Sequence, residues 1–482
     1  MENQDLNIIS ELFVGRFGAS PVEVRQLEGA GSSRRYYRMT GADGSHVIAT
    51  VGNSVKENEA FIMLDRHFAK QGVKVPEILA VADDRMAYLQ TDLGDTSLFD
   101  QLAGARRSGE WKADDVRLLE GVVKDLADMQ LDGIGDIDFS MCYPLASLDR
   151  SGVMWDLNYF KYCFLKAVLP EIDEPRLEAE FEKIADSVLT GDVPWGFMYR
   201  DFQSRNVMVH DSALWYIDFQ GGRRGPCLYD IVSFLWQARA AYSDAVRGHL
   251  LDVYFKAVCE KTGMSEKTLR NNLPDFVLFR TLQVLGAYGF RGYFERKSHF
   301  IKSIAPALRN LDELFKQCDF LHLPYIREVM RSVIERDKNK ESKQRTTLRV
   351  KVQSFSYKVG YPADDSGNGG GFVFDCRGVT NPGRFDQYKP LTGLDKPVID
   401  FIESNGEMQF FLDNAFALVS ASVRRYLERG FTDLSVAFGC TGGRHRSVYA
   451  AQHIAERINR ELGVEVELCH RERNIHAILP AR

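Results

Sequence analysis

The stretch "MYRDFQSRNVMVHDSALWYIDFQGG" (198–222) constrains the fold most, because two Asp residues follow apolar runs seventeen residues apart. An Asn follows the first Asp by five positions, which gives the set Asp201, Asn206 and Asp218. Transfer of a phosphoryl group from ATP needs such a set. One carboxylate orients the attacking hydroxyl and accepts its proton, while an Asn and a second Asp hold Mg²⁺ on the phosphates. Oxygen ligands of this kind suit a hard cation.

The ordinary alternative is that these three are turn and capping residues, since Asp and Asn are common there. The spacing D-x-x-x-x-N is nevertheless that of a protein-kinase catalytic loop, and a second Asp one hairpin later matches the metal-binding element. The run "LWYI" before Asp218 predicts a strand, which would hold the carboxylate on rigid backbone. We therefore favour the catalytic interpretation.

The rest of the first 335 residues predicts a β-rich lobe followed by an α-rich lobe. Residues 23–51 have short strand patterns with Gly-rich turns, 57–72 reads as a helix that stops at Gly72, and 76–94 reads as a β-hairpin. Helical patterns dominate 112–130, 154–190 and about 229–335. The charged segment "ERDKNKESKQRTT" (335–347) then indicates a linker or a solvated helix end.

A second domain is predicted beyond this segment. "TLRVKVQSFSY", "GFVFDCRG" and "DLSVAFGC" suit buried strands, "GYPADDSGNGGG" suits a flexible loop, and 397–430 and 446–462 are helical in pattern. Strands that alternate with helices favour an α/β domain. The predicted organisation is thus a domain at 1–335, a linker at 336–347 and a smaller α/β domain at 348–482.

Composition excludes several classes of protein. No apolar run approaches the roughly 20 residues of a membrane span, and "MENQDLNIIS" lacks the features of a secretory signal. The eight Cys are scattered without a CxxC pair, so we expect neither a zinc ribbon nor a disulfide framework, and a cytoplasmic location. The net charge of −6 does not suggest a nucleic-acid binder overall.

"YRDFQSRNVM" and "IDFQGGRRGPCLYDIVSFL" resemble the catalytic and metal loops of the aminoglycoside phosphotransferase-like kinases, a resemblance that covers roughly residues 10–325. It implies an α+β protein-kinase-like fold with two lobes, and ATP and Mg²⁺ as cofactors. Asp201 would be the catalytic base, and Asn206 and Asp218 the metal ligands. Asp230 would be structural and hold the catalytic loop; a helix N-cap is the alternative role, and the two roles need not conflict.

The same resemblance implies an ATP site. "EGAGSSRRYYR" (28–38) would cover the phosphates, and "YLQTDLGD" (88–95) would be the hinge that binds adenine. The Lys that often grips the phosphates is missing from "HVIATVG", which leaves Lys56, Arg35 or Arg38 as substitutes, with Glu59 as the partner on the next helix. The predicted ATP-binding residues are Gly29, Gly31, Ser32, Ser33, Arg35, Glu59, Gln90, Asp92 and Leu93.

Within this family, "GSSRRYYR", "LQTDLGD" and "RTLQVLGAYGFRGYFE" (280–295) look most like the N-acetylmuramate/N-acetylglucosamine anomeric kinases. The resemblance implies phosphorylation of the anomeric hydroxyl of an amino sugar, and a part in cell-wall recycling. Gln220, Arg223, Gln283 and Tyr288 are of the type that a sugar pocket needs, although each is equally typical of a surface or interhelix residue.

In the second domain, "VAFGCTGGRHRSVYAAQHIAERI" reads as strand, Gly-rich loop and helix. Backbone N–H groups at a helix N-terminus form a cradle for an anion. The C-x-x-x-x-x-R layout from Cys440 to Arg446 also serves cysteine phosphatases, in which a low-pKa thiolate attacks phosphate. Binding alone needs only the loop, which comprises Cys440, Thr441, Gly442, Gly443, Arg444, His445 and Arg446.

Residues 348–482 resemble the C-terminal domain of the RNase adapter protein RapZ, through "VQSFSYKVGYP", "FVFDCRGVTNP", "YKPLTGLD", "FGCTGGRHRSV" and "CHRE". The resemblance implies binding of glucosamine-6-phosphate and participation in small-RNA binding, with Arg377, Asn381 and His470 in the same pocket. No Lys follows Lys396, so the terminal basic cluster used for RNA is missing. We favour a phosphosugar sensor. The alternatives are a regulatory adapter that binds RNA or protein, and a phosphatase, for which no general-acid Asp is identifiable.

Overall fold

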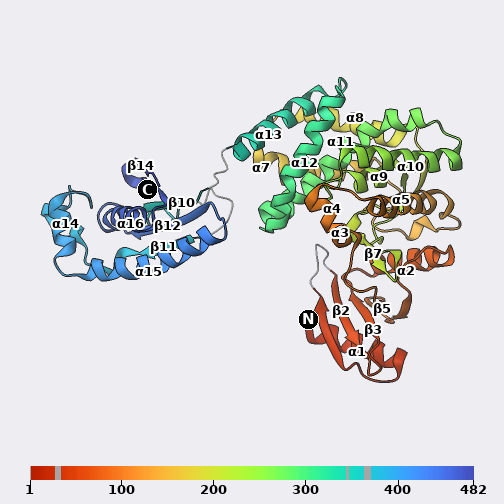
Figure 1. Cartoon of the computed structure of the whole chain (residues 1–482), viewed down its shortest axis with the longest axis horizontal. Coiled ribbons are helices and arrows are strands. Elements are labelled where there is room, and N and C mark those ends of the chain that lie inside the picture. The colour runs from red at the N-terminus through yellow and green to blue at the C-terminus, as the bar shows by residue number, and fades with distance from the viewer. Residues whose placement is uncertain (1, 28–33, 343–346, 363–370, 482) are drawn as a thin grey trace. The chain divides into compact units, whose positions relative to one another are not determined.

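The computed structural model of the chain describes residues 2–27, 34–342, 347–362 and 371–481. The chain divides into two compact units, Met1–Asp337 and Lys338–Arg482, which are drawn in Figure 1. The predicted phosphate-covering residues Gly29, Gly31, Ser32 and Ser33 lie outside the described residues.

The first unit begins with a five-stranded antiparallel sheet in the order β1-β2-β3-β5-β4, as the strand patterns predicted. A helix that the sequence pattern did not predict, α1, covers one face of this sheet (Figure 1). The elements of this lobe are α1 (Glu2–Phe17), β1 (Glu23–Leu27), β2 (Arg35–Thr40), β3 (His46–Val51), α2 (Val55–Lys70), β4 (Ile78–Val81) and β5 (Ala87–Thr91).

The two faces of the sheet have different neighbours. Tyr37 and Met39 of β2 are buried in a core with Ile9 and Phe13 of α1. Because successive side chains of a strand point to opposite faces, Tyr36 and Arg38 point to the other side. The face opposite α1 is therefore the one that carries residues 34, 36 and 38 toward the catalytic loops.

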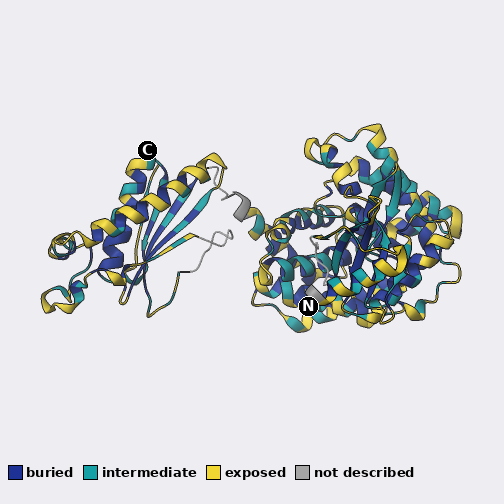
Figure 2. Ribbon diagram, turned by 90° about the horizontal axis from the view of Figure 1, so that it is seen from below, coloured by how far each residue is buried: buried dark blue, intermediate teal, exposed yellow. Residues whose placement is uncertain are grey.

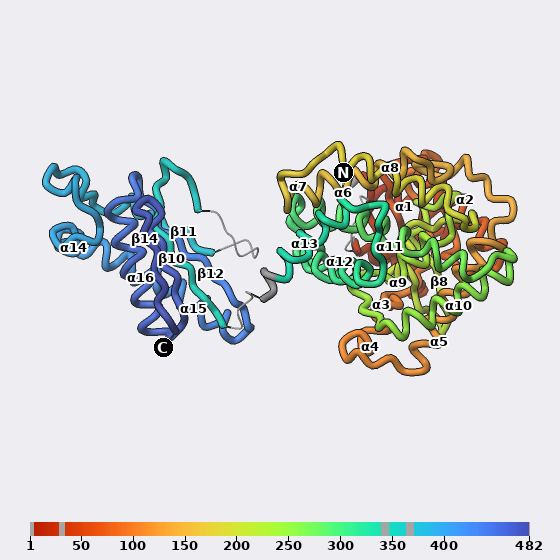
Figure 3. The backbone as a smooth tube through the Cα atoms, turned by 90° about the horizontal axis from the view of Figure 1, so that it is seen from above, coloured from red at the N-terminus to blue at the C-terminus, as the bar shows by residue number. Residues whose placement is uncertain are grey.

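The helical lobe that follows is centred on α11 (Glu266–Gly289), which packs against α6, α9 and α12 (Figure 3). Buried residues, dark blue in Figure 2, fill the interior of the lobe. Its other helices are α3 (Leu98–Gln101), α4 (Ala103–Ser108), α5 (Ala113–Ala127), α6 (Arg150–Phe160), α7 (Lys166–Val168), α8 (Glu174–Thr190), α9 (Leu228–Leu235), α10 (Asp244–Thr262), α12 (Ser298–Gln317) and α13 (Pro324–Ser342).

Two short antiparallel ladders lie between these helices in the sequence and carry the candidate catalytic loops. β6 (Trp195–Met198) pairs with β9 (Arg223–Pro226), and β7 (Val207–His210) pairs with β8 (Ala213–Tyr216). Asp201 and Asn206 lie between β6 and β7, and Asp218 lies between β8 and β9. The ladders thereby bring together two loops that are separate in sequence.

Helix α13 continues to Ser342, through the first half of the predicted linker 336–347. Glu, Lys and Arg are good helix formers, so the lack of apolar residues there does not by itself end a helix. The segment corresponds to the second of the two sequence alternatives, a solvated helix end. Among the described residues, no helix has a stretch that is both long and apolar enough to span a bilayer.

The second unit is an α/β fold with a five-stranded sheet in the order β11-β12-β10-β13-β14. All neighbours are parallel except β14, which pairs antiparallel with β13. Helices α15 and α16 lie side by side and α16 packs on the sheet (Figure 3). Its elements are β10 (Arg349–Ser356), β11 (Gly371–Asp375), α14 (Lys396–Glu403), α15 (Glu407–Glu428), β12 (Asp433–Cys440), α16 (Arg446–Leu462), β13 (Glu465–His470) and β14 (Ile475–Leu479).

Candidate functional site

Asp230 holds the loop that carries Asp201 through hydrogen bonds to the loop backbone. This carboxylate, fully buried on α9, accepts the backbone N–H of Tyr199 at 2.7 Å and that of Arg200 at 2.9 Å. Arg200 has a φ of +82°, a strained value for a residue with a side chain. Asp230 thus plays the structural part expected of it. It is not the helix cap, which is Cys227.

Asn206 joins the two loops. Its Nδ2 donates to the backbone carbonyl of Asp201 at 2.8 Å and to Oδ2 of Asp218 at 3.2 Å. The carboxylate of Asp201 is half exposed and lies 3.6 Å from the guanidinium of Arg280 on α11. The spacing along the sequence and the folded geometry therefore select the same three residues.

Asp218 lies in a setting that disfavours its negative charge. Burial raises the pKa of its carboxyl, and the negative charges of Asp201 and Glu57 add to the effect. Gln220 and Arg34 oppose it, Gln220 by donating to Oδ1 of Asp218 at 2.8 Å. The residue also has a φ of +70°. A bound cation would relieve this accumulation of negative charge.

Arg34 is the basic residue that the folded sheet brings to Asp218, and sequence reasoning missed it. Arg34 is buried, with 3% of its surface exposed. Its guanidinium lies 3.6 Å from the carboxylate of Glu57 on α2 and donates to the Glu57 carbonyl at 3.2 Å. Its charge opposes the raised pKa of Asp218. The Lys that the sequence lacks was expected to form an ion pair of this kind with a carboxylate of the next helix, beside Asp218.

The substitutes that the sequence suggested are placed elsewhere. Arg35 points to the α1 face, where it donates to Asp5 at 3.0 Å, because β2 alternates its side chains. Lys56 is exposed at the start of α2. Glu59 takes part in no ion pair within the described residues, and it is Glu57 that pairs with an arginine. The expected pair of a cation and a carboxylate of α2 is therefore formed by Arg34 and Glu57 and not by Arg35 and Glu59.

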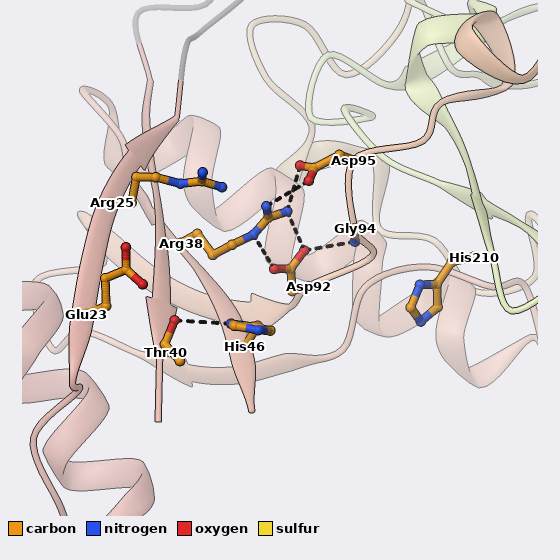
Figure 4. Close-up of a pocket in the computed structure, with 9 residues that line it drawn as sticks. All are labelled: Glu23, Arg25, Arg38, Thr40, His46, Asp92, Gly94, Asp95 and His210. Carbon is orange, nitrogen blue, oxygen red and sulfur yellow. Dashed lines mark hydrogen bonds and ion pairs between the residues drawn. The ribbon is translucent and has the colours of Figure 1, made fainter. Parts of the chain in front are cut away.

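Arg38 lies on the correct face but is bound to the hinge. Figure 4 shows its guanidinium between Asp92 and Asp95, with Nη2 donating to Asp92 at 2.9 Å. The Asp92 side chain also accepts the N–H of Gly94 at 2.8 Å. These contacts line an open pocket of about 590 Å³ beside the hinge, whose lining includes none of the catalytic triplet. Leu93 is buried, and the side-chain oxygen of Gln90 is buried without a hydrogen bond among the described residues.

The predicted acceptor residues surround the catalytic loop but contact different partners. Gln220 binds Asp218, and Gln283 accepts from Arg280. Arg223 is buried close enough to the catalytic loop for Asp201 to act on its charge; burial and the nearby Arg200 lower the pKa of its guanidinium. Tyr288 lies near Arg280 on the same helix, and burial raises its pKa. Arg280 itself was missed, since nothing local in "LFRTLQ" distinguishes it.

In the second unit, the strand–loop–helix places Cys440 at the end of β12 beneath the loop. Its thiol is 3% exposed and lies 3.1 Å from the hydroxyl of Ser447. Burial opposes ionisation, but hydrogen bonds from Ser447 and from the Arg444 backbone outweigh it and lower the pKa of the thiol. Thr441 and Gly442 are exposed, so their backbone remains open to a ligand.

Each of the three basic side chains of this loop donates to a backbone carbonyl of an earlier loop. Arg444 donates to the carbonyl of Leu391 at 2.9 Å, His445 donates to that of Tyr388 at 2.9 Å, and Arg446 donates to that of Val379 at 2.7 Å. The preceding loops leave backbone carbonyls that need donors, and these residues supply them. Arg446 uses Nη1 for these contacts, and its buried Nε has no hydrogen bond among the described residues.

The remaining predicted pocket residues fall into two groups. His470 is fully buried between Ser354 and Gln452, and burial lowers its pKa to about 4, so it is a structural residue of β13. Asn381 accepts the N–H of Gly383 at 3.2 Å as a helix cap. Arg377 is exposed, paired with Asp375 and placed over the ring of Tyr357 at 4.0 Å. Arg377 is the most exposed of the three.

A residue not predicted, Glu472, lies against the loop. A Cβ added at Gly443, which has a φ of +61°, would come within 2.7 Å of Oε2 of Glu472. That oxygen is buried and has no hydrogen bond among the described residues. Its other oxygen accepts from Arg471 at 2.8 Å. A hydrogen-bond acceptor, Oε2 of Glu472, therefore lies beside the exposed backbone of the loop.

Comparison with known proteins divides the chain in the same way. Residues 23–265 match the phosphotransferase enzyme family, and residues 348–474 match the RapZ C-terminal domain. A nucleotide-binding protein of Acidothermus cellulolyticus is 40% identical over 129 residues, which are 26% of this chain and 40% of that protein. Another, of Staphylococcus epidermidis, is 34% identical over 168 residues, 32% of this chain and 54% of that protein. The chain spans about half the length of the curated relatives it matches.

Solved structures with similar folds include the amicoumacin kinase hAmiN in complex with AMP-PNP, Ca²⁺ and Ami. It is 13% identical, with a TM-score of 0.45 over 66% of this chain and 96% of that one. A putative aminoglycoside phosphotransferase from Ralstonia eutropha is 14% identical, with a TM-score of 0.46 over 65% of this chain and 98% of that one.

Proposed function

The chain belongs to the phosphotransferase enzyme family, and on that premise we propose that its first unit is an ATP- and Mg²⁺-dependent kinase for a small molecule. The observation that carries the proposal is the joining of Asp201, Asn206 and Asp218 by one amide group, at 2.8 and 3.2 Å.

The residues present fit a metal that arrives with the nucleotide. Asp218 and Asn206 offer carboxylate and amide oxygens, which suit Mg²⁺. Within the described residues, no group of three or more His, Cys, Asp or Glu side chains is arranged to hold a metal alone. Mg²⁺ commonly keeps few protein ligands and shares the rest with phosphates, so this donor set is sufficient. The buried, unsatisfied oxygen of Gln90 supports a donor group of the adenine as its partner.

In this proposal, Asp201 accepts the proton of the acceptor hydroxyl, because it is the more exposed of the two carboxylates. Arg34, held by Glu57, faces the phosphates from the sheet. Mg²⁺ would supply charge neutralisation at the phosphates during transfer. Asp230 keeps Asp201 in position through the backbone of Arg200.

The acceptor proposed is the anomeric hydroxyl of an amino sugar of the N-acetylmuramate or N-acetylglucosamine type. Gln220, Arg223, Gln283 and Tyr288 lie around the catalytic loop and support it. Release of ADP is measured with a panel of free sugars, aminoglycosides and amino alcohols, followed by phosphorus NMR of the product. A sugar 1-phosphate is expected; a 6-phosphate, or activity only on aminoglycosides, contradicts the proposal.

For the second unit we propose binding of a phosphosugar such as glucosamine-6-phosphate at the carboxyl edge of the sheet. The exposed backbone of Thr441 and Gly442 beside the start of α16 would hold the phosphate. Arg377 is available as a charged donor, and the unsatisfied oxygen of Glu472 would accept from a hydroxyl or ammonium group of the sugar.

Calorimetric titration of the full chain with glucosamine-6-phosphate tests this proposal. Glu472→Gln should weaken binding by about tenfold, the scale of one hydrogen bond to a charged group. Release of inorganic phosphate that disappears in Cys440→Ser would instead make the loop catalytic. Tight binding of structured RNA at physiological salt would favour an adapter.

A further inference from the structure

A group of arginines lies beside the catalytic base, on elements that are distant in sequence. Arg205 belongs to the catalytic loop itself, and Arg106 lies on α4. Arg239 follows α9, and Arg280 lies on α11 at 3.6 Å from Asp201. The fold therefore gathers four guanidinium groups around one end of the catalytic loop.

Tyr288 and His299 show that these charges share one space. Arg280, Arg205 and Arg239 all oppose the raised pKa of Tyr288. Burial lowers the pKa of His299, and Arg205 and Arg239 lower it further. Arg205 and Arg239 act on both side chains and Arg280 acts on Tyr288, so charges from three separate segments meet in one local region.

Few carboxylates balance this region. Arg205 and Arg239 are exposed and have neither an ion pair nor a hydrogen bond within the described residues. Asp100 is the carboxylate that acts on both Arg106 and Arg205. Arg106 and Arg205 also lie over the same ring, that of Phe99, at 3.4 and 4.3 Å from its centroid.

Bringing these positive charges together is electrostatically unfavourable, and the pKa values of the arginines are shifted as a result. Burial lowers the pKa of both Arg106 and Arg205, and their mutual repulsion and that of Arg239 lower it further. An anion placed among them would reverse the repulsion. Guanidinium groups bind carboxylate and phosphate with paired hydrogen bonds, so an oxyanion is the natural occupant.

We infer that the acceptor carries an oxyanion, which Arg205 and Arg239 bind while its hydroxyl faces Asp201. The inference rests on the proposed kinase function and narrows it to an acceptor with a carboxylate or phosphate group, so that a neutral or a cationic acceptor is disfavoured. The hydroxyl of Tyr288, which makes no hydrogen bond among the described residues, is a further donor to that group.

The experiment compares sugars with one ring and different charge. Binding to the full chain, saturated with Mg²⁺ and a non-hydrolysable ATP analogue, is measured by calorimetry for cationic glucosamine, neutral N-acetylglucosamine, N-acetylmuramate and N-acetylglucosamine 6-phosphate. At least one anionic sugar should bind about tenfold more tightly than the neutral one, and this difference should shrink with added salt. The carboxylate and phosphate arms identify which oxyanion the region prefers.

The variants Arg205→Gln and Arg239→Gln assign the effect to this region. Each should weaken binding of the anionic sugar by about fivefold to tenfold and leave binding of the neutral sugar unchanged. Arg239→Lys should retain most of the affinity for the anionic sugar. Arg117→Gln on α5, an exposed arginine that pairs with Asp114, is the matched control and should change neither. Phosphosugar bound by the second unit does not respond to these variants.

The outcomes separate the two proposals. Equal affinity for neutral and anionic sugars, or anion affinity that survives both Gln variants, overturns the inference even when the sugar is phosphorylated. Anion affinity that depends on Arg205 and Arg239 supports it even when no ADP is released, in which case the proposed reaction fails instead.

Discussion

The carboxylate of Asp230 accepts the backbone N–H of Arg200 at 2.9 Å, so a fully buried helix residue fixes the peptide just before the candidate base. The second oxygen accepts the N–H of Tyr199 at 2.7 Å and the amide of Gln130 at 3.0 Å. Arg200 retains its left-handed φ because these contacts stabilise it. The position of Asp201 therefore depends on a residue that touches no substrate.

Replacing Asp230 by Asn should lower turnover more than nucleotide affinity. Asn accepts from one N–H but presents its own NH₂ group to another, which leaves a buried donor unsatisfied at a cost of about 1–3 kcal/mol. Unfolding in urea is followed by tryptophan fluorescence, because all five tryptophans lie in the first unit. The Asp230→Asn variant should turn over substrate about 10–100-fold more slowly. Unchanged turnover would show that the loop keeps its position without Asp230.

Asp201→Asn should reduce turnover by about 10²–10⁴, the span of losing a positioned proton acceptor. Affinity for a non-hydrolysable ATP analogue should remain, because Asn206 contacts the backbone carbonyl of Asp201 and not its carboxylate. Asp211→Asn is a matched control, since Asp211 is exposed in the neighbouring hairpin turn. Near-normal turnover of Asp201→Asn would remove this residue from its role.

Asp218→Asn should abolish the dependence of activity on Mg²⁺ concentration, together with the activity. Asn tolerates the φ of +70° at this position better than Ala, so the backbone is preserved and the loss reports on the charge. A titration of ADP release against Mg²⁺ measures it. A variant that still saturates with Mg²⁺ at the wild-type concentration would assign the metal to other ligands.

The local signals predicted that Asp201, Asn206 and Asp218 act together because the three residues flank one short hairpin, β7–β8, so that spacing along the chain translates directly into distance. The residues that were missed depend on contacts between distant segments. Arg34 and Arg35 are adjacent in the sequence, at the start of β2, yet Arg34 contacts Glu57 of α2 and Arg35 contacts Asp5 of α1. Arg280 reaches Asp201 only after α11 has packed.

The fold shows the same division. Helices and strands with a clear period were predicted, whereas α1 and β14 at the two ends of the chain were not. Helix α1 is stabilised by the sheet of the first lobe, whose strands lie further along the chain. Strand β14 is stabilised by a single partner strand, β13. The Gly-rich loop at the start of a helix, with its basic run Arg444–Arg446, indicated an anion site, but the carbonyls that these side chains bind belong to loops more than fifty residues earlier and could not be foreseen.

Arg34→Gln should raise the KM for ATP, by about tenfold or more, because the substitution removes the cation whose charge stabilises the ionised form of Asp218. Arg35→Gln is the matched control: it is the adjacent residue, has the same charge and points to α1, so the KM should not change. Glu57→Gln should have a smaller effect in the same direction. If Arg35→Gln raised the KM and Arg34→Gln did not, the assignment of the two faces would be reversed.

Asp65 gives the first unit a stability that depends on pH. Its side chain is buried on α2, one oxygen has no hydrogen bond among the described residues, and burial raises the pKa to about 8. In the unfolded chain the pKa is about 3.9. Between these two values the folded state retains a proton that the unfolded state has lost. The free energy of unfolding therefore falls as pH rises, by about 1.4 kcal/mol per pH unit from this group.

Asp65→Asn replaces the carboxyl by a neutral group of the same shape and should remove this slope, so that the variant is the more stable protein near neutral pH. Urea unfolding followed by tryptophan fluorescence at about pH 5, 6 and 7 measures both proteins within the window. Asp114→Asn, at an exposed ion pair on α5, is the control and should keep the wild-type slope. Parallel slopes for wild type and Asp65→Asn would mean that Asp65 is ionised in the folded state, with Arg66, the neighbouring cation, sufficient to hold its charge.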